Sequence, residues 1–278
     1  MTRMKFKDFS NRYLPEINND LSNYFADRDD DIFRMITYAL NSTGKRLRPL
    51  LTLATFAAAG NVINDSTIEA ATAVEFVHAY SLVHDDLPEM DDDTKRRNQS
   101  STWKKFGVGN AVLVGDGLLT EAFKKISNLS LPESIRLRLI YNLALAAGPD
   151  NMVRGQQYDL FSQDKVESID DLEFIHLMKT GALMTYAATA GGILAGLSDD
   201  KLRALNIYGA NLGIAFQIKD DLRDIKQDEE ENKKSFPRLI GVQKSQAELE
   251  EHLKISANAI KEIPDFQNTV LLDLLDRI

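Results

Sequence analysis

The sequence contains no cysteine, which excludes a disulfide framework, a thiolate zinc site and a cysteine nucleophile. Proline and glycine are scarce, with 7 and 15 in 278 residues, and these numbers are low for an all-β protein. Basic residues are also in deficit, because 33 Lys and Arg face 42 Asp and Glu and leave a net charge of −9. A chain this acidic is not expected to capture nucleic acid by general electrostatic attraction.

Long, strongly apolar runs are missing as well. Residues 180–198 carry no charge, but Ala, Gly and Thr dominate them. This composition favours a tightly packed buried helix over a membrane span. The first eight residues lack the apolar core of a signal peptide. We therefore expect a cytoplasmic protein with no membrane span.

Apolar residues recur at three- and four-residue spacing along nearly the whole chain, which predicts an all-α fold. No β-hairpin is expected, because no alternating β-branched run is flanked by turn residues. No segment reads as a linker, so we predict a single domain over residues 1–278. The predicted helices cover residues 6–25, 31–40, 48–59, 65–85 (capped by Asp65-Ser66), 111–129, 131–147, 152–161, 169–197, 198–226, 243–260 and 265–275.

Two groups of aspartates stand far apart in the sequence. The first, from Asp85 to Asp93, holds six carboxylates in nine residues at the end of an apolar helix. Like charges this close raise one another's pKa unless a cation neutralises them. In the second group, Asp220 and Asp224 lie about 40° apart on a helix and share a face with Gln217.

Pro88 interrupts the first aspartate group. On a straight helix Asp91 would point about 120° away from Asp85. Pro88 cannot donate a hydrogen bond to the carbonyl of His84, so we expect the helix to kink or bulge. Such a bulge would bring Asp91 back into line with Asp85.

Oxygen ligands without His or Cys suit Mg²⁺, which commonly binds through one or two carboxylates and the phosphates of a substrate. Two facing carboxylate sets therefore predict a clamp for a metal-bound diphosphate, although either set alone could be a solvated helix end. Basic residues at 44–49 (Gly-Lys-Arg-Leu-Arg-Pro) and 95–97 (Lys-Arg-Arg) support this hypothesis, because Arg and Lys bind phosphate oxygens. Taken alone, they could simply serve solubility.

Together these motifs resemble the trans-polyprenyl diphosphate synthases, and most of all the bacterial farnesyl diphosphate synthases. The matching segments run in order from residue 44 to about 241. They are Gly-Lys-Arg-Leu-Arg-Pro at 44–49, Val-Glu-Phe-Val-His-Ala-Tyr-Ser-Leu-Val-His-Asp-Asp-Leu-Pro at 74–88, Met-Asp-Asp-Asp at 90–93, Gly-Asp-Gly-Leu-Leu-Thr at 115–120, Gly155-Gln156 with Asp159, Lys-Thr-Gly-Ala-Leu at 179–183, and Phe-Gln-Ile-Lys-Asp-Asp-Leu-Arg-Asp at 216–224.

The resemblance implies a bundle of helices around a deep central cavity, usually in a homodimer. It implies head-to-tail condensation of isopentenyl diphosphate with an allylic diphosphate (dimethylallyl or geranyl), with release of diphosphate. It further implies dependence on Mg²⁺, about three ions per site. An aromatic residue at position 80 goes with a farnesyl product in this family.

The resemblance also assigns roles to individual residues. The implied Mg²⁺ ligands are Asp85, Asp86, Asp91, Asp92, Asp220, Asp221 and Asp224. The residues implied to hold isopentenyl diphosphate are Lys45, Arg48, His78 and Arg97, and those implied to hold the allylic diphosphate are Arg96, Lys179 and Lys234. The residues implied to be catalytic are Lys179, Thr180 and Gln217, of which Thr180 and Gln217 line the place where the allylic cation forms. The floor of the product pocket is assigned to Tyr80 and Ser81.

The chain departs from the family pattern at three places. Residues 98–103 differ after Arg97, Arg154 replaces a glycine, and only nine residues separate Asp224 from Lys234. The family segment is longer there and carries a further Gly-Lys pair as part of a lid, for which Lys226 or Lys233 could substitute. Three alternatives therefore stay open: a catalytically weak or silent subunit that regulates a partner, a synthase of geranyl or geranylgeranyl diphosphate, and a terpene cyclase.

Overall fold

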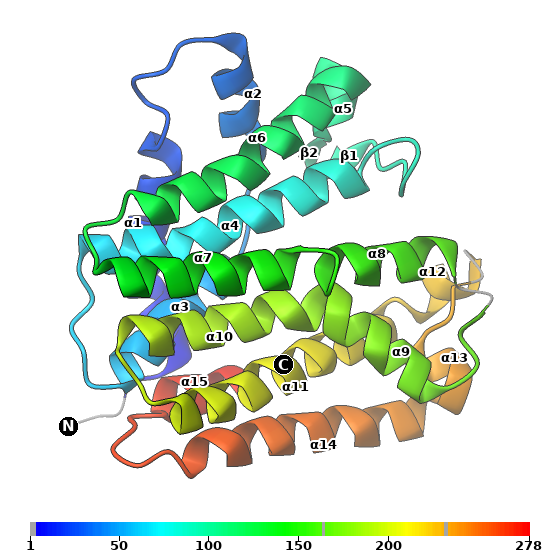
Figure 1. Ribbon diagram of the computed structural model, residues 1–278. Coiled ribbons are helices and arrows are strands. Elements are labelled where there is room, and N and C mark those ends of the chain that lie inside the picture. The colour runs from blue at the N-terminus through cyan, green and yellow to red at the C-terminus, as the bar shows by residue number, and fades with distance from the viewer. Residues whose placement is uncertain (1–3, 163–164, 231–232) are drawn as a thin grey trace. The chain divides into compact units, whose positions relative to one another are not determined.

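The computed structural model describes residues 4–162, 165–230 and 233–278. These residues are helical almost throughout, so the all-α prediction is confirmed (Figure 1). The helices are α1 (Phe6–Asn23), α2 (Asp31–Leu40), α3 (Leu47–Ala58), α4 (Asp65–Asp85), α5 (Thr102–Phe106), α6 (Val108–Ser127), α7 (Glu133–Ala147), α8 (Met152–Phe161), α9 (Ile169–His176), η2 (Leu177–Gly181), α10 (Ala182–Leu194), α11 (Asp199–Arg223), α12 (Ile225–Glu230), α13 (Phe236–Ile240), α14 (Val242–Lys261) and α15 (Thr269–Leu275).

The chain forms two compact units. Unit 1 comprises Met1–Phe6, Ala54–Val62 and Tyr141–Ile278, and unit 2 comprises Lys7–Leu53 and Ile63–Ile140. The chain passes from one unit to the other at four points, inside α1 (residues 6–7), α3 (53–54) and α7 (140–141) and at residues 62–63. The single domain over residues 1–278 and the central cavity both stay predictions.

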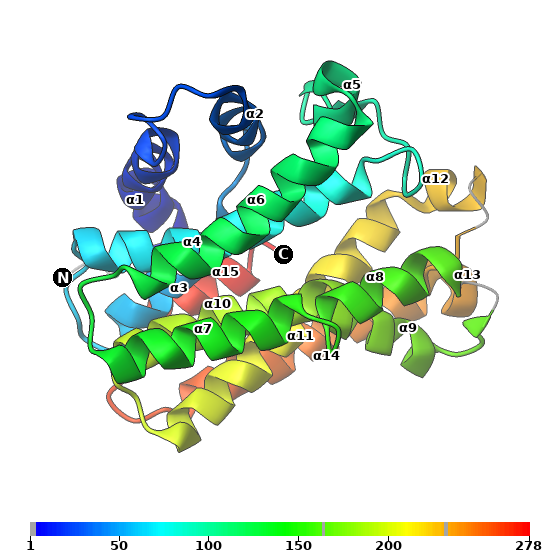
Figure 2. The same ribbon diagram turned by 45° about the horizontal axis from the view of Figure 1, so that its top comes forward.

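In unit 2, α4 is apolar on nearly every side and lies beside α6, as both ribbon views show (Figures 1 and 2). Asp20 of α1 ties these helices together, because it accepts a hydrogen bond from Thr72 of α4 (2.5 Å) and pairs with Lys125 of α6 (3.0 Å). The N-cap of α4 is Asn64, whose side chain accepts from Thr67 N, so the cap predicted at Asp65-Ser66 is wrong by one residue.

A short β-hairpin follows the first aspartate group, and the expectation of no hairpin is wrong. β1 (Lys95–Arg96) pairs antiparallel with β2 (Gln99–Ser100). The two turn residues, Arg97 and Asn98, have φ of 51° and 67°, which is the left-handed region that tight two-residue turns require. Strands of two residues are too short to show an alternating pattern in the sequence.

In unit 1, α11 lies against both α10 and α14. Tyr208 of α11 donates to Leu271 O (3.0 Å), and Ser256 of α14 donates to Tyr208 O (3.1 Å). Most of α10 is buried, as its small residues predict. Among the helices that the structure describes, none is long and apolar enough to cross a membrane.

The helix predicted over residues 169–197 contains an irregularity. It consists of α9, the π-helical turn η2 and α10. α9 begins with a capping box. The Ser168 side chain accepts a hydrogen bond from Asp171 N, and the Asp171 side chain accepts one from Ser168 N. The π turn carries Lys179 and Thr180, and such turns often occur at functional sites. The helix predicted over residues 198–226 likewise ends early, at Arg223, and α12 follows it.

Candidate functional site

The first aspartate group forms a returning loop at the end of α4, which we call the acidic loop (residues 85–93). The helix ends at Asp85 instead of bulging at Pro88. The chain then folds back, so that Asp91 N donates to Asp85 O (2.9 Å) and Asp92 N donates to Leu87 O (3.0 Å). The predicted bulge is wrong in form, but the expected return of Asp91 to Asp85 occurs at the backbone.

Arg96 is bound to this loop. Its Nε lies 2.7 Å from Asp86 Oδ1, and its Nη2 pairs with Asp86 and, at 2.8 Å, with Asp93. Asp86 is only 2% exposed, and burial raises its pKa although the guanidinium of Arg96 acts in the opposite direction. Asp86 and Arg96 thus form a partly desolvated ion pair at the base of the acidic loop.

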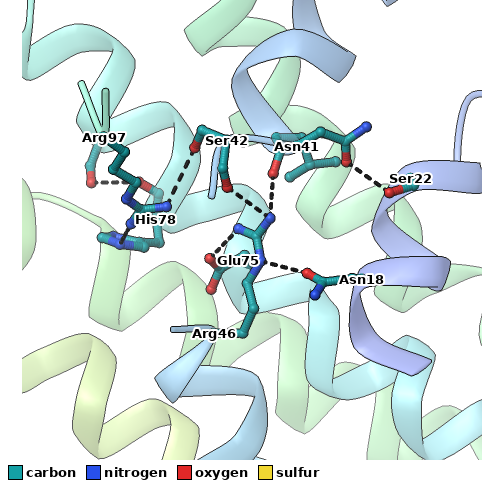
Figure 3. A network of polar contacts seen from close by, with 10 residues as sticks. Asn18, Ser22, Asn41, Ser42, Arg46, Glu75, His78 and Arg97 are labelled. Atoms are coloured by element: carbon teal, nitrogen blue, oxygen red, sulfur yellow. Dashed lines mark hydrogen bonds and ion pairs between the residues drawn. The ribbon is translucent and has the colours of Figure 1, made fainter. Parts of the chain in front are cut away.

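A second polar network lies in unit 2, around Arg46 (Figure 3). Arg46 is 5% exposed, has a positive φ of 47°, and forms an ion pair of 2.8 Å with buried Glu75. Its other hydrogen bonds run to Asn18 Oδ1, Leu40 O and Ser42 O. These four acceptors bind the guanidinium of Arg46, so Arg46 holds the segment 44–49 in place.

Arg48 and Arg97 are neighbouring cations of unit 2 that feel the charge of Glu75, although Glu75 itself pairs with Arg46. Nε of Arg48 is buried and has no hydrogen-bond partner among the described residues. Arg97 donates to Ser42 Oγ (3.4 Å) and contacts His78 Nε2 (3.3 Å), as Figure 3 shows. Across the part of the chain that the structure describes, no carboxylate forms an ion pair with Arg48 or Arg97.

His78 contributes no charge to this group. Burial first, and then the nearby charges of Arg48 and Arg97, hold the pKa of His78 well below its ordinary value. The imidazole is therefore neutral near pH 7, and its Nε2 accepts a hydrogen bond from Arg97. A neutral acceptor positions the guanidinium without cancelling its charge, which suits the binding of an anion.

Gly44 makes room for Arg97. A Cβ at position 44 would lie 2.5 Å from Arg97 Nη1, so any larger residue must displace the guanidinium. Arg97, His78, Asp86 and Arg96 also line one small cavity of about 20 Å³. Arg97 and His78 are therefore neighbours of the base of the acidic loop within unit 2.

Tyr80 lies on α4, about one turn before Asp85. Its ring is 7% exposed and packs edge-on against His84, with centroids 5.7 Å apart. Burial, and secondarily the charge of Asp85, raises the pKa of Tyr80 to about 12. Ser81 donates to His78 O (3.0 Å). The phenol is thus a fixed, neutral ring beside the acidic loop.

The second aspartate group lies in unit 1, at the end of α11. Arg223 joins two of its members, because Nη1 pairs with Asp220 (3.0 Å) and Nη2 with Asp224 (2.9 Å). Asp220 and Asp224 therefore share one side of the helix, as their spacing predicts. Asp221 has other partners: it accepts from Phe236 N (3.0 Å) and lies 3.5 Å from His176 Nε2.

Lys179 of η2 is held by Asp159 of α8. Lys179 Nζ lies 2.5 Å from Asp159 Oδ2, and Lys233 Nζ lies 3.8 Å from the same oxygen. Burial alone would raise the pKa of Asp159, but the charges of Lys179 and Lys233 outweigh it and lower the pKa. Gly155 permits this contact, since a Cβ there would lie 2.4 Å from Lys179 N.

The remaining candidate residues are more accessible. Lys45 is exposed, and Thr180, Gln217 and Lys234 are half-buried. Unit 2 thus brings together Arg48, His78, Arg97, Tyr80 and the acidic loop, and unit 1 carries Lys179 and Asp220 with Asp224. Sequence reasoning missed the roles of Arg46, Glu75 and Arg223. The sequence signal for Glu75 was a carboxylate within an apolar stripe. The signal for Arg223 was a cation three residues after Asp220.

Comparison with known proteins identifies the family of this chain. A family model described as polyprenyl synthetase matches residues 29–265. The chain is 36% identical over 279 residues to a farnesyl diphosphate synthase of Geobacillus stearothermophilus, covering 94% of this chain and 93% of the relative. It is 38% identical over 278 residues to that of Bacillus subtilis, with the same coverage.

Solved structures agree as well. An FPP/GFPP synthase from Zymomonas mobilis, in its apo structure, is similar with a TM-score of 0.85 and 31% identity, covering 97% of this chain and 98% of that one. The family model extends through segments of both units. The helical fold, the motifs and these similarities lead to one conclusion: the chain belongs to the polyprenyl synthetase family.

Proposed function

We propose that this chain is a Mg²⁺-dependent prenyltransferase. It condenses isopentenyl diphosphate with an allylic diphosphate, dimethylallyl or geranyl, to give mainly farnesyl diphosphate and free diphosphate. The observation that carries the proposal is that Arg48 and Arg97 form no ion pair with a carboxylate among the described residues, and that Arg97 lines one cavity with Asp86 of the acidic loop. The family and the names of the relatives support the same activity.

We assign isopentenyl diphosphate to Arg48 and Arg97. Arg48 and Arg97 offer guanidinium forks that bind phosphate oxygens at two points, and exposed Lys45 adds a mobile positive charge. Desolvation lowers the pKa of both guanidinium groups, but from so high an ordinary value that they keep their charge. The negative charge of a bound diphosphate would offset the desolvation free energy of the two guanidinium groups.

Divalent metal is assigned to the aspartates. The donors in both groups are carboxylate oxygens, which suits Mg²⁺, and Asp86 and Asp93 already share the single guanidinium of Arg96. The proposed ligands are Asp85, Asp86, Asp91 and Asp92 in unit 2 and Asp220, Asp221 and Asp224 in unit 1. When bound, Mg²⁺ would stabilise the negative charge on the departing diphosphate.

The reaction needs no protein nucleophile. The C–O bond of the allylic diphosphate breaks, and its electron pair leaves with the diphosphate. The double bond of isopentenyl diphosphate attacks the allylic cation, and loss of one proton, taken by the released diphosphate, gives the new double bond. Arg96, Lys179 and Lys234 stabilise the charge on the leaving group, and Thr180 and Gln217 line the place where the cation forms.

Product length is assigned to Tyr80, because a buried ring one turn before the acidic loop limits growth of the hydrocarbon. The name of the Zymomonas relative covers both FPP and GFPP, so a longer product is the alternative. The proposal also includes a homodimer and a cytoplasmic location, which the family resemblance suggests.

The decisive experiment is incubation of the purified chain with geranyl and isopentenyl diphosphates and Mg²⁺, followed by chain-length analysis of the products. Farnesyl diphosphate formed only when both substrates and Mg²⁺ are present is the expected result. Diphosphate release without isopentenyl diphosphate would indicate a cyclase, and no release would indicate a silent subunit. Arg97→Gln should raise KM for isopentenyl diphosphate far more than KM for geranyl diphosphate.

A further inference from the structure

Three side chains of unit 1 that belong to neither aspartate group converge on one point. Glu173 comes from α9, and Glu248 and His252 come from α14. One ligand atom from each lies within 4.8 Å of the others. Glu248 and His252 are four residues apart and therefore share a face of their helix. Two helices thus present two carboxylates and one imidazole to a common point.

The ring of His252 has a defined tautomer. Asn211 of α11 donates from Nδ2 to Ile207 O (2.9 Å), which orients its Oδ1 toward His252 Nδ1 at 2.8 Å. Oδ1 can only accept, so Nδ1 carries the proton and donates it. In the neutral ring Nε2 is then a bare lone pair, and it points at Glu173. A histidine held through one nitrogen by a polar partner is the usual arrangement around a bound metal.

Burial and distance argue in the same direction. His252 is only 8% exposed, and its Nε2 lies 3.5 Å from Glu173 Oε1. A charge-assisted hydrogen bond would be about 2.8 Å long. Two ligands that bind one tetrahedral ion at about 2.1 Å are about 3.4 Å apart. The observed spacing therefore matches two ligands of a metal better than it matches a direct hydrogen bond.

The charges point to a cation as well. A protonated His252 could balance only one of the two carboxylates, whereas a divalent ion balances both and needs no proton on the imidazole. One nitrogen and two oxygen ligands suit Zn²⁺ and its first-row neighbours, while the oxygen-only aspartate groups suit Mg²⁺. Three protein ligands leave at least one position for water.

We propose that Glu173, Glu248 and His252 form a binding site for a divalent transition-metal ion of Zn²⁺ type that links α9 to α14. The site is independent of the prenyl-transfer proposal, since none of its residues has a role there. α9 continues directly into η2, which carries Lys179, so the metal also anchors the helix that precedes this lysine.

The test is a titration of the full-length, chelator-treated chain with ZnCl₂ in excess Mg²⁺, followed by calorimetry. Excess Mg²⁺ occupies the oxygen-only ligands, so that one further equivalent of Zn²⁺ is expected to bind. His252→Gln and Glu248→Gln should each weaken this binding by on the order of 100-fold, and Asn211→Ala by about 10-fold. The matched control is Glu251→Gln on the same helix, whose carboxylate pairs with exposed Lys254, and it should bind like the wild type.

Two further measurements keep the proposal falsifiable if a variant folds poorly. Co²⁺ added to the wild type should give the visible absorption of a nitrogen- and oxygen-bound tetrahedral ion, and Zn²⁺ should raise the Tm of the wild type but not that of Glu248→Gln. The proposal is overturned if the wild type binds no Zn²⁺ in excess Mg²⁺, or if His252→Gln binds it as tightly as the wild type. An imidazolium signal from His252 that persists in saturating Zn²⁺ would also overturn it, in favour of a simple ion pair.

Discussion

Removing the carboxylate of Glu75 should destabilise the protein strongly. Glu75 and Arg46 are 3% and 4% exposed and pair at 2.8 Å, and the other partners of Arg46 are neutral. Glu75→Ala therefore leaves a guanidinium buried with no counter-charge. Breaking one side of a buried pair costs about 3–5 kcal/mol. At about 2–4 °C per kcal/mol for a large domain, Tm should fall by roughly 10 °C.

A double-mutant cycle separates the pair from the cavity that truncation creates. Replacing both partners, as in Arg46→Met with Glu75→Leu, removes the charge and keeps most of the volume. Because no charge is left unbalanced, the double variant should lose less stability than the two single changes together, with a coupling of about 1–3 kcal/mol. Urea unfolding followed by far-ultraviolet circular dichroism measures all four proteins.

The exposed pair between Arg34 and Asp31 provides the control. Its atoms are 3.4 Å apart, but the side chains are 64% and 88% exposed, so Asp31→Asn should leave the unfolding midpoint unchanged. If Glu75→Ala unfolds at the same urea concentration as the wild type, burial of the pair does not stabilise unit 2 and this reasoning fails.

Three further predictions concern function. Tyr80→Ala should lengthen the product beyond farnesyl diphosphate, because a buried ring is removed one turn before the acidic loop; mass analysis that finds only farnesyl diphosphate would contradict the assignment of the pocket floor. Gly44→Ala should push the guanidinium of Arg97 aside and lower kcat/KM for isopentenyl diphosphate by on the order of 10- to 100-fold, with little change in KM for geranyl diphosphate in steady-state assays. Asp159→Asn should free Lys179 and raise KM for the allylic substrate. Since the pKa of Asp159 is lowered in the folded protein, its stabilisation is present above its ordinary pKa of about 4 and is lost as the pH falls through the folded value. Urea unfolding at a series of acidic pH values should therefore show wild type and Asp159→Asn converging, and a constant gap would refute the linkage.

Helices with clear ends were predictable from the sequence. The expected ranges 31–40 and 152–161 coincide with α2 and α8, because apolar periodicity in each is bounded by polar or turn residues. The hairpin at 95–100 was not predictable, since its strands are two residues long and are set by the backbone of Arg97 and Asn98. The spacing of apolar residues reveals a helix or strand only when that helix or strand is longer than one repeat of the spacing.

The sequence shows which residue types could bind metal or diphosphate, but not the directions of their side chains. The segment 44–49 contains three cations, and the sequence does not show that the second of them, Arg46, turns inward to Glu75. The same limit applies at Asp220 and Asp221. Adjacent residues on a helix point about 100° apart, and Asp221 faces α13 while Asp220 faces Arg223. Neighbouring carboxylates in a motif therefore have different partners.

The π-helical turn η2 makes this part of the chain sensitive to its length. A π turn holds one residue more than the α-helical turn that it replaces, and each residue rotates a helix by about 100°. Deleting a single residue between 177 and 181 would restore a regular α-helical turn. The helix downstream would keep nearly its present phase, but the side chains inside the turn would point in other directions. The small residues of α10 would still face α11, but the ammonium of Lys179 would no longer reach Asp159. The irregularity thus sets the direction of Lys179 without disturbing the packing of the helix that follows.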